Sequence, residues 1–232
     1  MIDINKASKR IKGSLVLDNV SITIPKGAIV GLAGVNGSGK TMLLRAIAGL
    51  IGLTSGSISI DGQIIGRDRA FPPSIGLLIE NPAFLNAYTG RDNLRMLAGV
   101  GRHVSGIGAK AHALADKLAV RSLEAVGLDP FDKRKFRKYS LGMKQRLGIA
   151  AAIMEEPDIV LLDEPTNALD VQGVSLFEEL VDAQRRRGAT LLIASHDASL
   201  LDAMADIVYT FSDGKVIDVS VQKEPPVLKE LS

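Results

Sequence analysis

The residues Gly34–Thr41 read GVNGSGKT and fit the pattern G-x-x-x-x-G-K-[ST], a loop that cradles phosphate groups. Backbone N–H groups of such a turn, together with the positive end of the helix that follows, point at one spot and bind anions. The residues expected to contact a nucleotide are Gly34, Asn36, Gly37, Ser38, Gly39, Lys40, Thr41 and Met42. Lys40 is expected to reach the β- and γ-phosphates, and the Thr41 hydroxyl to hold Mg²⁺. The pattern predicts a nucleotide-binding protein.

The flanks of this loop argue against a chance match of a glycine-rich turn. Residues 28–33 form a short apolar run, which is typical of a buried parallel strand. Residues 40–49 have apolar positions at helical spacing and end on a glycine, as helices often do. A strand, a turn and a helix in this order are what a phosphate-binding loop requires.

A second chemical signal follows another apolar run, Ile159–Leu162, which leads directly into Asp163 and Glu164. At the carboxyl end of a parallel strand, Asp163 would lie beside the phosphates and hold Mg²⁺ through water. Glu164 could orient and deprotonate an attacking water molecule. The alternative is a buried strand that ends in surface acids, and the segment Pro165–Asp170 that follows makes this alternative weaker.

The composition sets limits on the protein class. The chain has 232 residues, of which 46% are hydrophobic and 23% charged, so it forms one large domain or two lobes. A net charge of +2 gives no sign of a strongly basic nucleic-acid binder, and the lack of cysteine excludes disulfides and thiolate metal sites. No apolar run approaches the roughly 20 residues that cross a bilayer. A role at a membrane would therefore require spanning helices from another polypeptide.

The order of elements predicts an α/β fold: a P-loop NTPase core with a parallel sheet, a small antiparallel β subdomain and an inserted helical subdomain. Strands are expected at 15–24, 28–33, 57–60, 74–79, 158–162, 190–194, 207–211 and 215–219, and helices at 40–49, within 89–127, and at 140–154, 171–187 and 198–205. Thr89 is a plausible N-cap. We expect one domain over 1–220, with residues 1–80 and 156–220 as core, 81–155 as the helical insertion and 221–232 as a loose tail.

Four motifs in this order and spacing resemble the ATP-binding-cassette (ABC) ATPases over almost the whole chain. They are Gly34–Thr41, Tyr139–Arg146 (YSLGMKQR), Leu161–Pro165 (LLDEP) with Ala168–Asp170 (ALD), and Ser195–Asp197 (SHD). The combination is much more specific than the phosphate loop alone.

The resemblance implies a dimer that holds two ATP molecules head to tail. Ser140 and Gly142 of one subunit would contact the γ-phosphate held by the phosphate loop of the other. His196 would bind the same phosphate, and Asp170 would lie across the dimer interface. Taken alone, Ser140 is an ordinary helix N-cap, and both interpretations can hold together. Ser195–Asp197 is not a nucleophilic triad, since the members of a triad meet in space rather than in sequence.

Four positions in three motifs depart from the usual pattern of the family. Glu80 stands where a glutamine usually approaches Mg²⁺; a carboxylate would bind the ion more strongly but repel the γ-phosphate. This glutamate resembles the exporters that move antimicrobial peptides such as lantibiotics and confer self-immunity. Ile11 stands where an aromatic residue usually stacks on adenine. Leu141 and Met143 replace a glycine and a glutamine of the signature.

The resemblance implies an ATPase subunit that binds and hydrolyses ATP to power a membrane transporter, with a lean towards export of peptide antibiotics. Its expected partners are a transmembrane permease on a separate chain and a second copy of itself or a related ATPase subunit, with no nucleic acid. It would work in the cytoplasm, peripheral on the inner face of the membrane. Phe84, Leu85 and Tyr88 could receive a helix of the partner or could be ordinary core. The alternative function is a soluble ABC-type ATPase that acts on nucleic acid or ribosomes.

Overall fold

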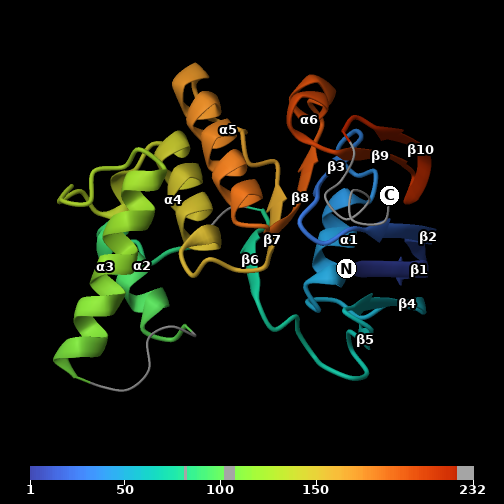
Figure 1. Ribbon diagram of the computed structural model, residues 1–232, viewed down its shortest axis with the longest axis horizontal. Coiled ribbons are helices and arrows are strands. Elements are labelled where there is room, and N and C mark those ends of the chain that lie inside the picture. Colours follow the sequence, from blue (N-terminus) through green and yellow to red (C-terminus); the bar gives the residue numbers. More distant parts are fainter. Residues whose placement is uncertain (81–82, 102–107, 224–232) are drawn as a thin grey trace.

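The computed structural model describes residues 1–80, 83–101 and 108–223. Asn81 and Pro82, at the expected start of the helical insertion, lie outside these residues, as does most of the expected tail. Figure 1 shows strands β1, β2 and β4 at one end of the molecule, strands β6 to β8 in the middle, and a group of helices, α2 to α4, at the other end. The predicted α/β fold class is confirmed.

A six-stranded, mainly parallel sheet forms the centre of the molecule. Its strand order is β10-β9-β3-β8-β7-β6, and only β10 runs antiparallel to its neighbour. The strands are β3 (Ile29–Ala33), β6 (Ile75–Leu78), β7 (Ile159–Asp163), β8 (Thr190–Ser195), β9 (Ile207–Ser212) and β10 (Lys215–Val221). Every residue of β3, β7 and β8 is buried, which explains why these strands read as unbroken apolar runs. The strands predicted from those runs are confirmed.

A second, antiparallel sheet has the order β2-β1-β4-β5. Its strands are β1 (Ile2–Ile11), β2 (Ser14–Ile24), β4 (Ser55–Ile60) and β5 (Gln63–Ile64). The strands predicted at 15–24 and 57–60 are confirmed, but β1 was not among the predicted elements. Irregularities in its pairing with β2 between Ile4 and Arg10 interrupt the alternation of buried and exposed residues. Because of these bulges, β1 lacks the regular period from which a strand is inferred.

Six α-helices occur in the described part of the chain. They are α1 (Lys40–Ile47), α2 (Gly90–Ala98), α3 (Ala109–Ala125), α4 (Leu141–Ile153), α5 (Val171–Arg186) and α6 (Ala198–Met204), with a 3₁₀ turn over Phe136–Lys138. Thr89 caps α2 in a capping box with Asp92, as predicted, and Ser140 caps α4 by accepting a hydrogen bond from the N–H of Met143. No helix in the described ranges is long and apolar enough to cross a membrane.

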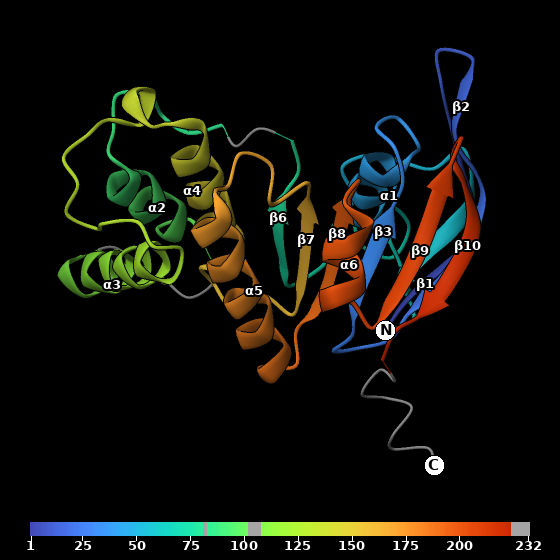
Figure 2. The same ribbon diagram turned by 90° about the horizontal axis from the view of Figure 1, so that it is seen from above.

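The helices cover both faces of the central sheet, as Figure 2 shows from above. Alternate side chains of each strand point to opposite faces. Val160 and Leu162 pack in one core cluster with α4, α5 and α6, whereas Leu161 packs with α1 and the antiparallel sheet in the other. The first cluster also contains buried residues of α2 and α3, so one continuous core joins the helical group to the sheet.

Asp206 ties three elements together inside this core. Its side chain is 1% exposed, accepts a hydrogen bond from the N–H of Ile29 at 2.8 Å, and pairs with Arg185 at 2.5 Å. Its own N–H donates to the carbonyl of Ile29 at 2.7 Å. The carboxylate thus joins the start of β3, the end of α5 and the start of β9.

We predict that Asp206→Ala lowers the free energy of unfolding by about 2–4 kcal/mol, because it leaves a buried N–H and a partly buried guanidinium without their acceptor. Asp218→Ala, at an exposed position of β10, is the control and should cost less than about 0.5 kcal/mol. Urea denaturation followed by circular dichroism measures both. Equal midpoints for the two variants would contradict this role of Asp206.

Candidate functional site

A cavity of about 610 Å³ lies where the phosphate loop, the end of β7 and the β1–β2 hairpin meet. Its lining contains most of the residues predicted to hold a nucleotide or a metal ion. The lining residues are Ile11, Lys12, Ser14, Val16, Asn36, Gly37, Ser38, Gly39, Lys40, Thr41, Met42, Glu80, Asp163 and Glu164. Segments far apart in the sequence therefore converge on one cavity.

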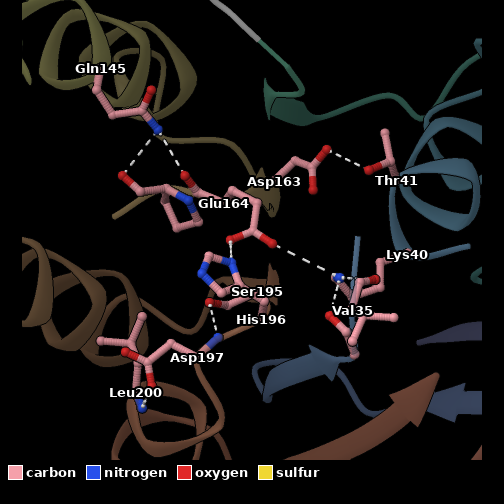
Figure 3. Close-up of polar contacts among 12 residues, drawn as sticks. Val35, Lys40, Thr41, Gln145, Asp163, Glu164, Ser195, His196, Asp197 and Leu200 are labelled. Carbon is pink, nitrogen blue, oxygen red and sulfur yellow. Dashed lines mark hydrogen bonds and ion pairs between the residues drawn. The ribbon is translucent and has the colours of Figure 1, made fainter. Parts of the chain in front are cut away.

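Lys40 lies at the first position of α1, with its side chain 4% exposed. Its Nζ donates to the carbonyl of Gly34 at 2.5 Å and to that of Val35 at 3.1 Å (Figure 3). Burial lowers the pKa of Lys40, while the charges of Glu164 and Asp163 act in the opposite direction. A bound phosphate would offset the cost of burying the positive charge of Lys40.

Gly39 has to be a glycine for two reasons. Its φ of +110° lies in the left-handed region, and a Cβ at this position would approach the carbonyl oxygen of Val16 to 2.9 Å. The N-terminus of α1 lies at the cavity, and no side chain forms a capping hydrogen bond with it. The loop is therefore shaped by its backbone, as a phosphate cradle requires.

Asp163 lies at the last position of β7 and accepts a hydrogen bond from the Thr41 hydroxyl at 2.7 Å. Burial raises the pKa of Asp163; the charges of Glu164 and Glu80 raise it further, and Thr41 and Lys40 oppose the shift. Among the described residues, Asp163 Oδ1 and Glu164 Oε1 are buried oxygens with no hydrogen-bond partner. Carboxylate oxygens that accept no hydrogen bond, beside a hydroxyl, fit the oxygen ligands that Mg²⁺ prefers.

Glu164 is held from several sides. Its backbone N–H donates to the carbonyl of Ala194 at 2.8 Å, and Gln145 Nε2 donates to its carbonyl at 3.0 Å. The carboxylate lies 2.8 Å from His196 Nδ1 and 3.9 Å from Lys40 Nζ (Figure 3). Its φ of +47° is rare for a residue with a side chain, and such strain is stored where a functional group must be aimed.

Gln145 has no role in the sequence analysis, although it belongs to the signature segment. It also donates to the carbonyl of Pro165 at 3.1 Å, so α4 holds the chain directly after β7 in place. The sequence shows that Gln145 belongs to this motif, but it does not show that the side chain binds the carbonyls of Glu164 and Pro165.

Ser195–Asp197 form a local cap and not a triad. Ser195 Oγ accepts a hydrogen bond from the N–H of Asp197 at 3.0 Å, and Asp197 caps α6 by accepting one from the N–H of Leu200 at 3.2 Å. His196 is 54% exposed and points towards Glu164 (Figure 3). The imidazole therefore lies at the open side of the carboxylate.

A second cavity, of about 630 Å³, contains three further predicted residues, whereas Gly34 and His196 line neither cavity. Ser140, Gly142 and Asp170 line it, together with Arg134 and Arg146, and it shares no residue with the first cavity. Asp170 caps α5 and pairs with Arg146 at 2.8 Å. One chain thus brings Lys40, Thr41, Asp163, Glu164 and Glu80 together but leaves Ser140 on a separate surface.

Two of the residues that depart from the family pattern, Ile11 and Glu80, line the first cavity. Ile11 ends β1 and lies at the cavity rim, 37% exposed. Glu80 has a φ of +62° and pairs with Arg45 at 2.5 Å. No sequence motif predicted Arg45 or the β1–β2 hairpin residues Lys12, Ser14 and Val16. The glycine at position 13 is a turn signal that could have indicated the hairpin.

The sequence and the fold of this chain are similar to those of known proteins. The family model described as "ABC transporter" matches residues 17–167. The chain is 45% identical over 216 residues to YybJ of Bacillus subtilis (strain 168), an ABC transporter ATP-binding protein, covering 93% of this chain and 94% of that protein. It is 34% identical over 217 residues to the lantibiotic transport ATP-binding protein SrtF of Streptococcus pyogenes, covering 94% and 89%.

The fold is also similar to that of ABC transporter proteins. The dimeric structure of MJ0796, a bacterial ABC transporter cassette, matches with a TM-score of 0.86 and 25% identity, over 97% of this chain and 100% of that one. Another relative, 34% identical over 220 residues, is the bacitracin transport ATP-binding protein BcrA of Enterococcus faecalis, of which the match covers 68%, and 94% of this chain. The predicted resemblance is confirmed: the chain belongs to the ABC transporter family, as one of its ATPase subunits.

Proposed function

We propose that the first cavity binds ATP with Mg²⁺. The observation that supports this most strongly is a buried lysine and a threonine hydroxyl that face two carboxylates in one cavity, each with a buried oxygen that accepts no hydrogen bond. Lys40 and the loop would hold the phosphates, and Thr41 and Asp163 would hold the metal ion, with Glu80 near it. The bound ion would neutralise the charge that develops on the phosphates. Ile11 would cover the nucleobase.

Glu164 is the group best placed to accept a proton from the attacking water. Lys40 and His196 flank its carboxylate, and the contacts of its backbone with Ala194 and Gln145 limit its movement. A fixed carboxylate beside the phosphate site can both orient the water and take its proton. His196 would hold the carboxylate and contact the terminal phosphate.

We predict that Glu164→Gln lowers the steady-state rate of ATP hydrolysis about 100- to 1000-fold, since the amide cannot accept the proton. Nucleotide binding should persist, because Lys40 and the loop are unchanged. Glu179→Gln, at an exposed position of α5, is the control and should hydrolyse ATP at the parental rate. Phosphate release measures turnover, and unchanged turnover in Glu164→Gln would exclude this role.

The second cavity supports a head-to-tail dimer, in which Ser140 and Gly142 complete the site of the other copy. Ser140 caps α4, so a hydroxyl and a helix N-terminus lie together on a surface that its own phosphate loop does not share. Two apolar side chains beside the caps are exposed, Leu141 at 64% and Val171 at 86%. A partner that brings phosphates to this surface would cover both, and Asp170 would lie at the same interface.

The dimer can be tested by comparing two helix caps. In a Glu164→Gln background with ATP, light scattering should give the mass of a dimer, and adding Ser140→Ala should abolish most of it. Thr89→Ala removes the matching cap of α2 and is the control. Each cap loss should cost about 1 kcal/mol of stability, so only a direct contact with ATP would make Ser140 different. Equal dimer formation by both variants would contradict the proposal.

The membrane function is inferred from the relatives. SrtF and BcrA are named as lantibiotic and bacitracin transport ATP-binding proteins. We infer that this chain powers the export of a peptide antibiotic from the cytoplasmic face of a membrane, with a transmembrane partner on a separate chain. Leu85 and Tyr88 are 53% and 46% exposed and could receive a partner helix, whereas Phe84 packs against the core. The alternative, action on nucleic acid or ribosomes, has no support among these relatives.

Copurification tests the partner. A tagged chain purified from detergent-solubilised membranes should carry an integral membrane protein, and the double variant Leu85→Asp and Tyr88→Asp should lose it. Val219→Asp, which changes a 53% exposed residue of β10, is the control and should retain it. Recovery of ribosomes or nucleic acid in place of a membrane protein would favour the alternative function.

A further inference from the structure

An ion pair between Arg45 and Glu80 lies at the first cavity, which is the proposed nucleotide cavity. Its arginine has no part in the chemistry proposed so far. Arg45 is in the last turn of α1, the helix that begins at the phosphate loop, and Glu80 follows β6. Arg45 Nη2 and Glu80 Oε1 are 2.5 Å apart, and the two side chains are 30% and 61% exposed. The pair joins the phosphate-binding helix to the segment that leads into the helical group.

Glu80 adds a negative charge to a cavity that already contains two. The lining has the carboxylates of Glu80, Asp163 and Glu164 against the ammonium groups of Lys12 and Lys40. A triphosphate is itself strongly negative, and an uncompensated carboxylate would repel it.

Arg45 supplies the charge that balances this cavity. With its guanidinium included, three positive groups oppose three carboxylates. Glu80 also has a φ of +62°, a conformation that non-glycine residues adopt rarely, so its place at the cavity depends on contacts such as this one.

We propose that Arg45 is a positioning residue for nucleotide binding, which neutralises Glu80 and holds its carboxylate at the cavity without repulsion of the terminal phosphate. This inference rests on the proposed function, in which the cavity binds ATP. Because the pair as a whole is neutral, loss of Arg45 alone leaves an unpaired carboxylate, whereas loss of both charges leaves none. The two residues should therefore act as one unit in nucleotide binding.

A double-mutant cycle tests the pair without any hydrolysis. Calorimetry in EDTA gives dissociation constants of ATP and ADP for the parent, Arg45→Met, Glu80→Gln and the double variant. Arg45→Met should weaken ATP binding about fivefold and ADP binding less, since the repulsion acts mainly on the terminal phosphate. The double variant should bind ATP as tightly as Glu80→Gln alone. The loss in Arg45→Met should shrink at high ionic strength.

A matched control is available on α3. Arg121 and Glu156 form another exposed pair at 2.5 Å, and neither residue lines the nucleotide cavity, so Arg121→Met should bind both nucleotides like the parent. The role of Arg45 is overturned if Arg45→Met binds ATP normally, or if Glu80→Gln fails to reverse the loss in a variant with an unchanged melting temperature. Failure of the parent to bind either nucleotide would instead overturn the proposed function.

Discussion

A buried lysine opposed by two carboxylates at the carboxyl edge of the parallel sheet is the interaction on which this site depends. Lys40 is almost completely removed from water, and its charge is offset by loop carbonyls and by Glu164 across 3.9 Å. Taking charges out of water is costly unless partners replace the water. One buried oxygen of Asp163 and one of Glu164 accept no hydrogen bond, so the hydrogen bonding within the chain is incomplete. A ligand with phosphate and metal charges would complete it.

The fold places the first cavity, with Lys40 and Glu164, apart from the surface at the N-terminus of α4. Ser140 and Asp170 cap α4 and α5 at a second cavity, while Lys40 and Glu164 line the first. Gln145 lies between the two, since it belongs to α4 and binds the carbonyls of Glu164 and Pro165. A movement of α4 would therefore be transmitted to the strand end that holds Glu164. The same core cluster contains residues of α4 and of the central sheet, so this connection is supported by packing as well as by hydrogen bonds.

The two departures from the usual family pattern that lie at the first cavity occur at its rim and not at its centre. The phosphate loop, Asp163 and Glu164 keep the residue types that the chemistry requires, whereas Ile11 and Glu80 differ. A change at the rim can alter base contacts or charge without removing the phosphate cradle. For Glu80 the structure contains a compensating partner in Arg45, which makes the pair nearly neutral as seen from the cavity.

The sequence alone determined those features that depend on neighbouring residues. The phosphate loop, the apolar strands β3, β7 and β8, and the caps Thr89 and Ser140 were all predictable, because turn geometry, burial on both faces and capping are properties of short segments. Strand β1 was not, because its bulges interrupt the alternating pattern.

Only the tertiary structure decided which distant residues meet. Arg45 and Glu80 are 35 positions apart, Gln145 and Glu164 are 19 apart, and Ile11 reaches the cavity through the pairing of β1 with β2. No local pattern encodes such contacts, since they arise when packed elements bring their ends together. The separation of Ser140 from the phosphate loop was likewise settled by the path of the chain through the helical group, which places the two motifs on different cavities.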